Sequence, residues 1–119
     1  MRYVQYYDDV NGAALLPFPI KVLVNFNFNG TVIFGNSINV KNIQYISIGQ
    51  YKVNFITPVD NINYSIFVSG TADDSSLTVW GGEVGTYLER SINSTTIQMV
   101  NAVGAVNPSL TSVFIVSNF

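Results

Sequence analysis

The feature that most constrains the fold is a short phrase that occurs twice. Residues 21–26 read Lys-Val-Leu-Val-Asn-Phe, and residues 51–55 read Tyr-Lys-Val-Asn-Phe. In both segments, β-branched and aromatic residues alternate with other types, and a period of two is typical of a strand that buries one face. The phrase therefore predicts two strands with the same burial pattern, in which the asparagine points away from the core.

Other alternating or apolar segments are spaced at roughly 8–12 residues with turn residues between them, which is typical of an all-β sandwich or small barrel. Asn29-Gly30 is a strong hairpin signal. The pattern predicts an all-β chain that folds as an antiparallel, jelly-roll-like β-sandwich. Strands are expected at residues 2–7, 20–28, 31–34, 40–48, 51–56, 63–69, 77–80, 94–103 and 110–117.

Two segments fit this pattern less regularly. Gly81-Gly82 and Gly85 predict a flexible bend after the short strand at 77–80. The apolar spacing within residues 94–103 would also suit a helix, but the β-branched content and the following Gly104 favour a strand.

The last predicted strand contains a continuous apolar run, Val113–Val116. Such a run is typical of a strand that is buried on both faces. It predicts a central position in a sheet, or a cover provided by another subunit.

The chain has 119 residues, which suits one domain. We expect residues 1–19 to form an N-terminal arm or first strand and residues 20–119 to form the β-sandwich domain. The N-terminus carries acids where a secretory signal needs an apolar run. The longest apolar stretch, residues 13–24, is interrupted by two prolines and a lysine. It falls short of the roughly 20 residues that a membrane helix needs, so no membrane insertion is expected.

Charged residues are scarce. The chain is 48% hydrophobic and 10% charged, whereas ordinary soluble domains are about 25% charged. A sparsely charged surface suits a subunit that is partly covered in an assembly, so we expect an oligomer. The net charge is −2 and the 5 cations are scattered singly. Nucleic-acid binding requires clustered cations that neutralise phosphates, so no nucleic-acid partner is expected.

Residues suited to catalysis are also few. The chain has no histidine and no cysteine, which excludes Ser-His-Asp and Cys-His arrangements and thiolate metal sites. A glycosidase needs two carboxyls roughly 5–10 Å apart, which Glu83 and Glu89, with Asp73 and Asp74 nearby, could supply in principle. No motif holds such a pair, so we expect solvated loop acids and predict no enzyme, no catalytic residue and no cofactor. Asp73-Asp74 lacks the ligand spacing of a calcium loop, so we predict a turn there and no metal site.

Trp80 is the candidate for a receptor contact. It precedes two glycines and lies close in sequence to Asp73, Asp74 and Tyr87. Aromatic faces together with carboxylate acceptors suit glycans, so we predict a glycan contact formed by these four residues. The alternative is that the only tryptophan caps the edge of the core.

A candidate subunit contact is predicted from apolar side chains that the buried face of each strand does not account for. Leu23 alternates away from the core in the first phrase, and Ile56 follows the second phrase on the same parity as its asparagine. Val113 and Ile115, from the continuous apolar run, are added to this set. A face that is apolar and uncharged is where another subunit is expected to bind.

Several of these segments resemble tail-fibre and related structural proteins of tailed phages. That family has a Lys-x-Trp-Val-Asn-Phe-Asn strand, a Gly-Thr-Val hairpin, an Asn-Val-x-x-Ile strand, a Gly-x-Tyr-x-Val-Asn-Phe strand and an Asn-Tyr strand. The similar segments here are 20–27, 30–32, 39–43, 49–55 and 63–64, and the ending at 96–98 and 113–116 is also similar. The resemblance covers residues 20–119. Leu23 stands where the family usually has tryptophan, and residues 33–38 are more apolar than in the family.

The resemblance implies a β-rich virion module that is often distal on a fibre and often trimeric, and it carries over no catalytic residues. We therefore expect a non-enzymatic virion structural protein of a tailed phage, in the form of a tail-fibre or fibre-tip subunit that contacts the host surface. Its expected partners are itself, as a homotrimer, other virion proteins and a host-surface glycan, for which several copies would provide avidity. The alternatives are a capsid decoration or head-fibre protein, and a free-standing carbohydrate-binding module.

Overall fold

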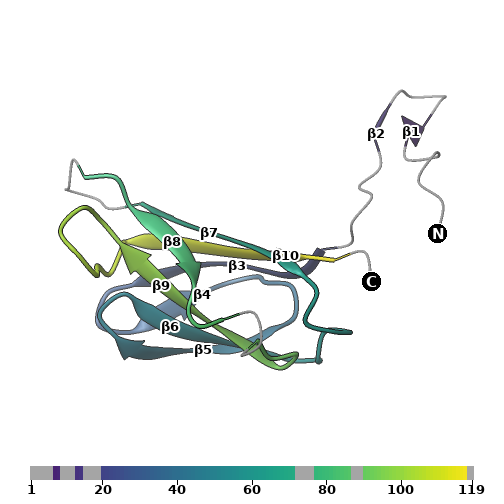
Figure 1. Ribbon diagram of the computed structural model, residues 1–119, viewed down its shortest axis with the longest axis horizontal. Coiled ribbons are helices and arrows are strands. Elements are labelled where there is room, and N and C mark those ends of the chain that lie inside the picture. The colour runs from purple at the N-terminus through teal and green to yellow at the C-terminus, as the bar shows by residue number, and fades with distance from the viewer. Residues whose placement is uncertain (1–6, 9–12, 15–19, 72–76, 87–89, 118–119) are drawn as a thin grey trace.

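The chain is a β-structure in a computed structural model that describes residues 7–8, 13–14, 20–71, 77–86 and 90–117. No helix occurs in these ranges (Figure 1). The main strands are β3 (Ile20–Phe28), β4 (Val32–Phe34), β5 (Val40–Ser47), β6 (Gln50–Phe55), β7 (Ser65–Thr71), β8 (Trp80–Glu83), β9 (Ser94–Val100) and β10 (Leu110–Val116). Two short strands, β1 (Tyr7–Asp8) and β2 (Ala13–Ala14), pair with each other. The arm predicted at 1–19 stays a prediction, because most of it lies outside the described residues.

The eight main strands form two antiparallel sheets that pack face to face (Figure 1). Sheet I has the order β4-β3-β10-β7, and sheet II has the order β5-β6-β9-β8. Every pairing is antiparallel, and the first and last of the eight strands, β3 and β10, are neighbours in the middle of sheet I. The predicted all-β sandwich is confirmed at this level: eight antiparallel strands in two packed layers.

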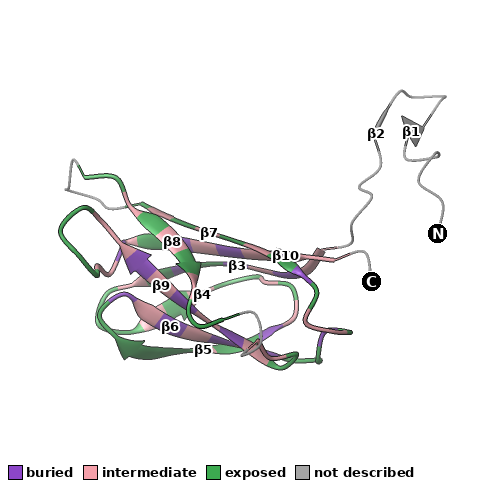
Figure 2. Ribbon diagram, viewed as in Figure 1, coloured by how far each residue is buried: buried purple, intermediate pink, exposed green. Residues whose placement is uncertain are grey.

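The two copies of the repeated phrase lie in opposite sheets and face each other across the core. Residues alternate between buried and less buried along β3 and β6, as predicted (Figure 2). The ring of Phe26 from sheet I meets the ring of Tyr51 from sheet II edge to face, with centroids 5.1 Å apart. The buried hydrophobic residues are Val22, Val24, Phe26, Val40, Tyr51, Val53, Phe55, Val59, Tyr64, Ile97, Met99, Val113 and Ile115.

Two glycine turns fix the register of the hairpins. The β3–β4 hairpin predicted from Asn29-Gly30 is confirmed, with Phe28 paired to Val32 and Gly30 at a φ of 80°. Gly49, between β5 and β6, has a φ of 78°, and a Cβ there would lie 2.5 Å from the carbonyl oxygen of Met99. Both the backbone angle and the close approach of β9 therefore require glycine at this turn.

Strand β10 is central in its sheet, as predicted, because it pairs with β3 on one side and β7 on the other. Within the single chain, its two faces are not equally buried. Val113 and Ile115 point into the core, whereas Phe114 and Val116 lie on the outer face of sheet I and are only partly buried. The continuous apolar run therefore has one side in the core and the other on the outer face of sheet I, and the cover by another subunit on that outer face stays a prediction.

The segment after residue 76 also differs from the prediction. Gly81-Gly82 forms the middle of strand β8 instead of a flexible bend. Gly81 faces the core, where a Cβ would lie 2.5 Å from Cγ1 of Val68, so close packing explains this glycine. Strand β9 ends at Val100, earlier than predicted, because Asn101 begins a turn in which its backbone N–H donates to the carbonyl of Gly104.

Candidate functional site

Trp80, the exposed tryptophan, is an outward-facing residue of β8. The alternation of a strand places Trp80 and Gly82 on the side opposite to Gly81, which faces the core. Trp80 is 54% exposed, so its indole does not cap the core. This outcome favours the surface role predicted for Trp80. The three residues predicted to accompany it, Asp73, Asp74 and Tyr87, lie outside the described residues.

A shallow groove lies beside Trp80 on the outer face of sheet II. Gly82 forms part of it, and a Cβ on Gly82 would have no atom within 4 Å. The cross-strand partners on β9 are Val100, opposite Trp80, and Gln98, opposite Gly82. The groove has a volume of about 290 Å³, at the lower end of the roughly 300–1,000 Å³ of small-molecule sites. The lining residues are Trp80, Gly81, Gly82, Glu83, Gln98 and Val100.

Polar side chains extend from this groove across the rest of sheet II. The register places Gln50 next to Gln98, Lys52 next to Thr96 and Gln44, and Asn54 next to Ser94 and Asn42. The side-chain amide of Asn54 donates to Oδ1 of Asn42 at 2.7 Å and to Oε1 of Gln44 at 3.2 Å. We call these eight residues the amide face. Lys52 is the only charged residue among these eight, and Lys41 lines a pocket beside Asn42 and Asn54, at the end of the face away from the groove.

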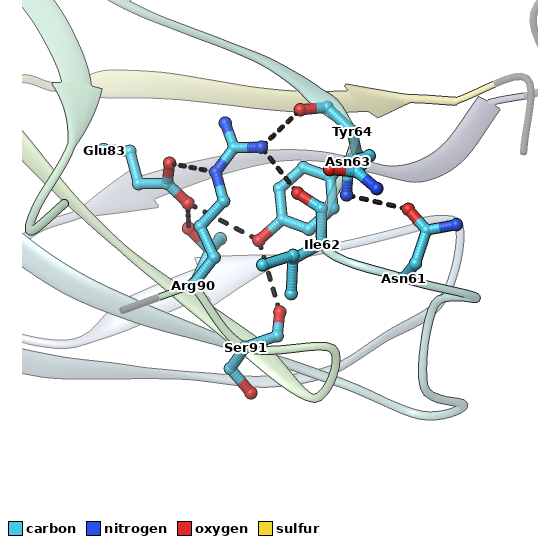
Figure 3. A network of polar contacts seen from close by, with 8 residues as sticks. Asn61, Ile62, Asn63, Tyr64, Glu83, Arg90 and Ser91 are labelled. Atoms are coloured by element: carbon cyan, nitrogen blue, oxygen red, sulfur yellow. Dashed lines mark hydrogen bonds and ion pairs between the residues drawn. The ribbon is translucent and has the colours of Figure 1, made fainter. Parts of the chain in front are cut away.

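Beneath the groove, a partly buried ion pair holds β8 to its neighbours (Figure 3). The Nε of Arg90 donates to Oε1 of Glu83 at 2.8 Å, and the two side chains are 15% and 17% exposed. The second carboxylate oxygen of Glu83 accepts a hydrogen bond from the hydroxyl of Thr95 at 3.1 Å. Arg90 Nη1 donates to the carbonyl oxygens of Ile62 at 2.8 Å and Tyr64 at 2.6 Å. The guanidinium therefore connects β8 to the segment just before β7, and the Glu83 carboxylate connects β8 to β9.

Tyr64 completes this network. Its hydroxyl donates to the carbonyl of Ser91 at 3.2 Å and lies 3.4 Å from Glu83 Oε2, and the guanidinium of Arg90 lies 4.4 Å from its ring centroid. Burial, followed by the negative charge of Glu83, raises the pKa of Tyr64 to about 12. The phenol is therefore neutral at ordinary pH. Glu83, one of the acids considered above for a glycosidase pair, is committed to this structural network.

The predicted subunit contact does not form one surface. Val113 and Ile115 are 0% exposed, so their inclusion was wrong: they belong to the core side of β10, and no other subunit can reach them in the folded chain. Leu23 lies on the outer face of sheet I, whereas Ile56, 66% exposed, follows β6 of sheet II. The repeated phrase occurs in both sheets, so its two outward sides point away from each other.

An apolar row on the outer face of sheet I was missed by the sequence interpretation. Phe114 pairs with Phe67 on one side and Leu23 on the other, and Leu23 forms a β-bridge with Ile38. The rings of Phe67 and Phe114 are 5.7 Å apart, and Phe67 is 56% exposed. We call these four residues the apolar row. The parity of β7 and β10 would have indicated it, had the outward positions been compared across strands.

Comparisons with known proteins add no relative: no protein-family model, curated protein or solved structure matches the chain. The described residues contain no helix that could span a membrane. They also contain no cluster of acidic residues that could hold a metal ion. The features of the described residues that bear on function lie on the outer faces of the two sheets.

Proposed function

We propose that the chain is a non-enzymatic structural protein of a tailed-phage virion, a tail-fibre or fibre-tip subunit that contacts the host surface. The segments that resemble tail-fibre proteins correspond to successive elements, namely β3, the β3–β4 hairpin, β5 and β6. The resemblance thus follows the framework strands of both sheets and is not confined to one turn or one strand. Shared framework strands are what a common structural module would retain, which supports the proposal.

The apolar row is the observation that carries the assembly part of this proposal. Phe67, Phe114, Leu23 and Ile38 lie side by side across sheet I, and none of them is charged. An exposed apolar patch of this kind is typical of a surface that another protein covers. In the proposed homotrimer, this row is assigned to the contact with a second copy.

The solution mass tests this proposal directly. Light scattering coupled to gel filtration, over a range of micromolar concentrations, is expected to give three times the chain mass of 13.1 kDa. A mass that stays at that of one chain over the whole range would contradict the proposed fibre subunit.

The position in the particle separates the tail from the capsid, where a decoration or head-fibre protein would lie. Gold-labelled antibodies against the purified chain, applied to particles of the encoding phage, are expected to mark the tail tip in electron micrographs. Labelling over the head would favour the capsid alternative, and unlabelled particles that lack the chain by mass spectrometry would contradict both.

A second candidate function, a free-standing carbohydrate-binding module, is favoured by the groove beside Trp80. An exposed indole next to a side-chain amide and a bare glycine is a suitable surface for a sugar ring. A monomer that binds glycans and is missing from particles would support this function over the virion proposal.

A further inference from the structure

We infer that the groove formed by Trp80, Gly82 and Gln98 binds a neutral oligosaccharide, with one sugar ring stacked on the indole. This inference deepens the host-contact part of the proposed function and rests on it. It names the binding residues and the class of glycan, and it places the site on the outer face of sheet II rather than in a loop.

Trp80 supplies the stacking surface. Its side chain is 54% exposed although it belongs to a regular strand whose next residue packs into the core. An indole in this position has a fixed backbone and presents apolar area that water cannot solvate well. The apolar face of a pyranose ring covers such an area while its hydroxyls remain available at the ring edge.

Gly82 makes room for the ligand. It lies two residues after Trp80 on the same face, and a Cβ there would meet no protein atom within 4 Å. Gly82 has no positive φ, so its backbone does not demand glycine. This distinguishes it from Gly81, where a Cβ would lie 2.5 Å from Val68 and 2.7 Å from the sulfur of Met99. Packing explains the first glycine of the pair, and space above the sheet explains the second.

Gln98 and Gln50 supply the hydrogen-bonding groups. Gln98 lies opposite Gly82, and Gln50 lies next to Gln98 on β6. Their side chains make no hydrogen bond within the described part of the chain, in contrast to Asn54, which bonds Asn42 and Gln44. A side-chain amide offers two donors and an acceptor, and sugar hydroxyls accept and donate in turn. The direction from Gln98 to Gln50 extends the site beyond the first ring.

The charges around the groove select a neutral ligand. Glu83 is the only ionisable residue among the lining residues, and its carboxylate is paired with Arg90 and accepts from Thr95. None of the described residues that line the groove is a cation, whereas arginine and lysine are the usual partners of sialate carboxylates and phosphates. The nearest cation on the amide face is Lys52, the next outward residue of β6 after Gln50, and it pairs with Thr96 rather than with Gln98.

The site is held rigid from below. Gly81 packs on Val68 and Met99, and Glu83 is fixed by its ion pair with Arg90, so both inward residues of β8 are anchored. A preorganised surface loses little conformational freedom when a ligand binds, which favours weak ligands such as sugars.

Binding to the purified 119-residue chain tests the inference. The probes are a printed array of neutral, sialylated and phosphorylated glycans, followed by calorimetric titration with the neutral glycan that gives the strongest signal. Neutral glycans are expected to bind. Trp80→Ala should weaken binding at least about tenfold, which corresponds to about 1.4 kcal/mol, and Gln98→Ala should weaken it several-fold.

Gly82→Val is the most discriminating variant. The new side chain fills the floor of the groove without meeting the protein, and a β-branched residue suits a strand better than glycine. Binding should be lost while the melting temperature stays the same or rises, a combination that a structural role for Gly82 would not produce. Ile48→Ala is the matched control for Trp80→Ala, because it removes a similarly exposed apolar side chain, 59% against 54%, that belongs neither to the groove nor to the apolar row.

The outcomes separate this inference from the virion proposal. Unchanged binding in Trp80→Ala, full binding in Gly82→Val, a preference for sialylated or phosphorylated glycans, or no neutral binding at millimolar concentration would each overturn it. If Gly82→Val fails to fold, the Trp80 and Gln98 variants still decide. A trimer that does not bind glycans would leave the proposed assembly standing without this site, and a monomer that binds through Trp80 would do the reverse.

Discussion

The outer faces of the two sheets are built by the same alternation but have opposite chemistry. On sheet I, the apolar row crosses the strands with Phe67, Phe114 and Leu23, whereas sheet II presents Gln98 and Asn54 at the equivalent outward positions. The core specifies only the inward residues, so each outer face can be suited to a different partner. An uncharged apolar row suits contact with another protein, and a neutral amide face suits a hydrated ligand.

The largest effect is expected from the ion pair beneath the groove. Arg90→Ala leaves the Glu83 carboxylate, 17% exposed, without its cation and removes the donor to two backbone carbonyls. We expect the free energy of unfolding to fall by about 3 kcal/mol, the lower end of the range for breaking a buried pair, because both side chains keep some contact with water. Urea unfolding followed by tryptophan fluorescence measures this loss and reports directly on β8.

The double variant Glu83→Gln, Arg90→Met is the control, because it removes both charges together. It should recover part of the loss, since no uncompensated charge stays buried. A single Arg90→Ala variant that unfolds like the wild type would show that sheet II does not depend on this network, and the rigidity of the groove would then need another explanation.

High pH should lower the free energy of unfolding through one tyrosine on each side of the core, over the same pH range. Burial raises the pKa of Tyr64, near the groove, and of Tyr51, in the middle of the core, from 10.0 to about 12. The folded state therefore holds these phenol protons more tightly than the unfolded state. The resulting stability is complete below pH 10 and is lost as the pH rises through 12, by about 3 kcal/mol for each tyrosine.

Unfolding in urea at successive pH values from 8 to 12, with phenolate absorbance recorded in parallel, measures this loss. Tyr51→Phe should flatten the dependence, although it also removes the hydrogen bond from the tyrosine hydroxyl to Oδ1 of Asn107, at 2.9 Å. A stability that is constant up to pH 12 would mean that both phenols ionise as easily in the folded protein as in the unfolded chain.

The contrast between the two outer faces is tested most directly by replacing outward apolar side chains of sheet I with polar ones. The double variant Phe67→Ser, Phe114→Ser removes two adjacent members of the apolar row, whose rings lie 5.7 Å apart. We expect the solution mass to fall to that of one chain, with a stability loss of only about 1–2 kcal/mol, because neither ring belongs to the core. Light scattering and urea unfolding of the same samples separate the two effects.

The matched control changes the same number of outward residues on the other sheet. Gln44→Ser with Gln50→Ser should leave the mass unchanged, because the amide face is not assigned to contact between copies. A fall in mass with this variant, or none with the apolar-row variant, would reverse the assignment of the two faces.

Much of the fold could be predicted from the sequence, because alternation and turn residues act locally. The strands at 20–28 and 51–55, and the hairpin at Asn29-Gly30, follow from period two and from the positive φ that glycine allows. The strand at Gly81-Gly82 could not be predicted. Gly81 is required because Val68 of β7, in the other sheet, packs against it, and this tertiary contact has no local signal.

The surfaces were predicted less well for a related reason. Trp80 was identified from its type alone, but Gln98 becomes its neighbour only through the pairing of β8 with β9. Val113 and Ile115 were assigned to the surface because a continuous apolar run does not reveal which parity faces inward. Their pairing with Val24 and Val22, both buried, decides that question in the structure.

The smallest effect is expected at an ion pair that borders the outer face of sheet I. Lys21 lies two residues before Leu23, and its Nζ is 3.6 Å from Oδ2 of Asp60, whose side chain is 66% exposed. Water solvates such a pair well, so Lys21→Met should change the free energy of unfolding by less than about 1 kcal/mol. Added salt should leave the wild-type stability almost unchanged for the same reason. The solution mass should also be retained, because the apolar row lies beyond this pair.

The control for this variant is Lys41→Met, with urea unfolding as the measurement. A loss much larger than about 1 kcal/mol for Lys21→Met alone would mean that sheet I relies on charge at its border. The contrast between an apolar face and a polar one would then have to be redrawn.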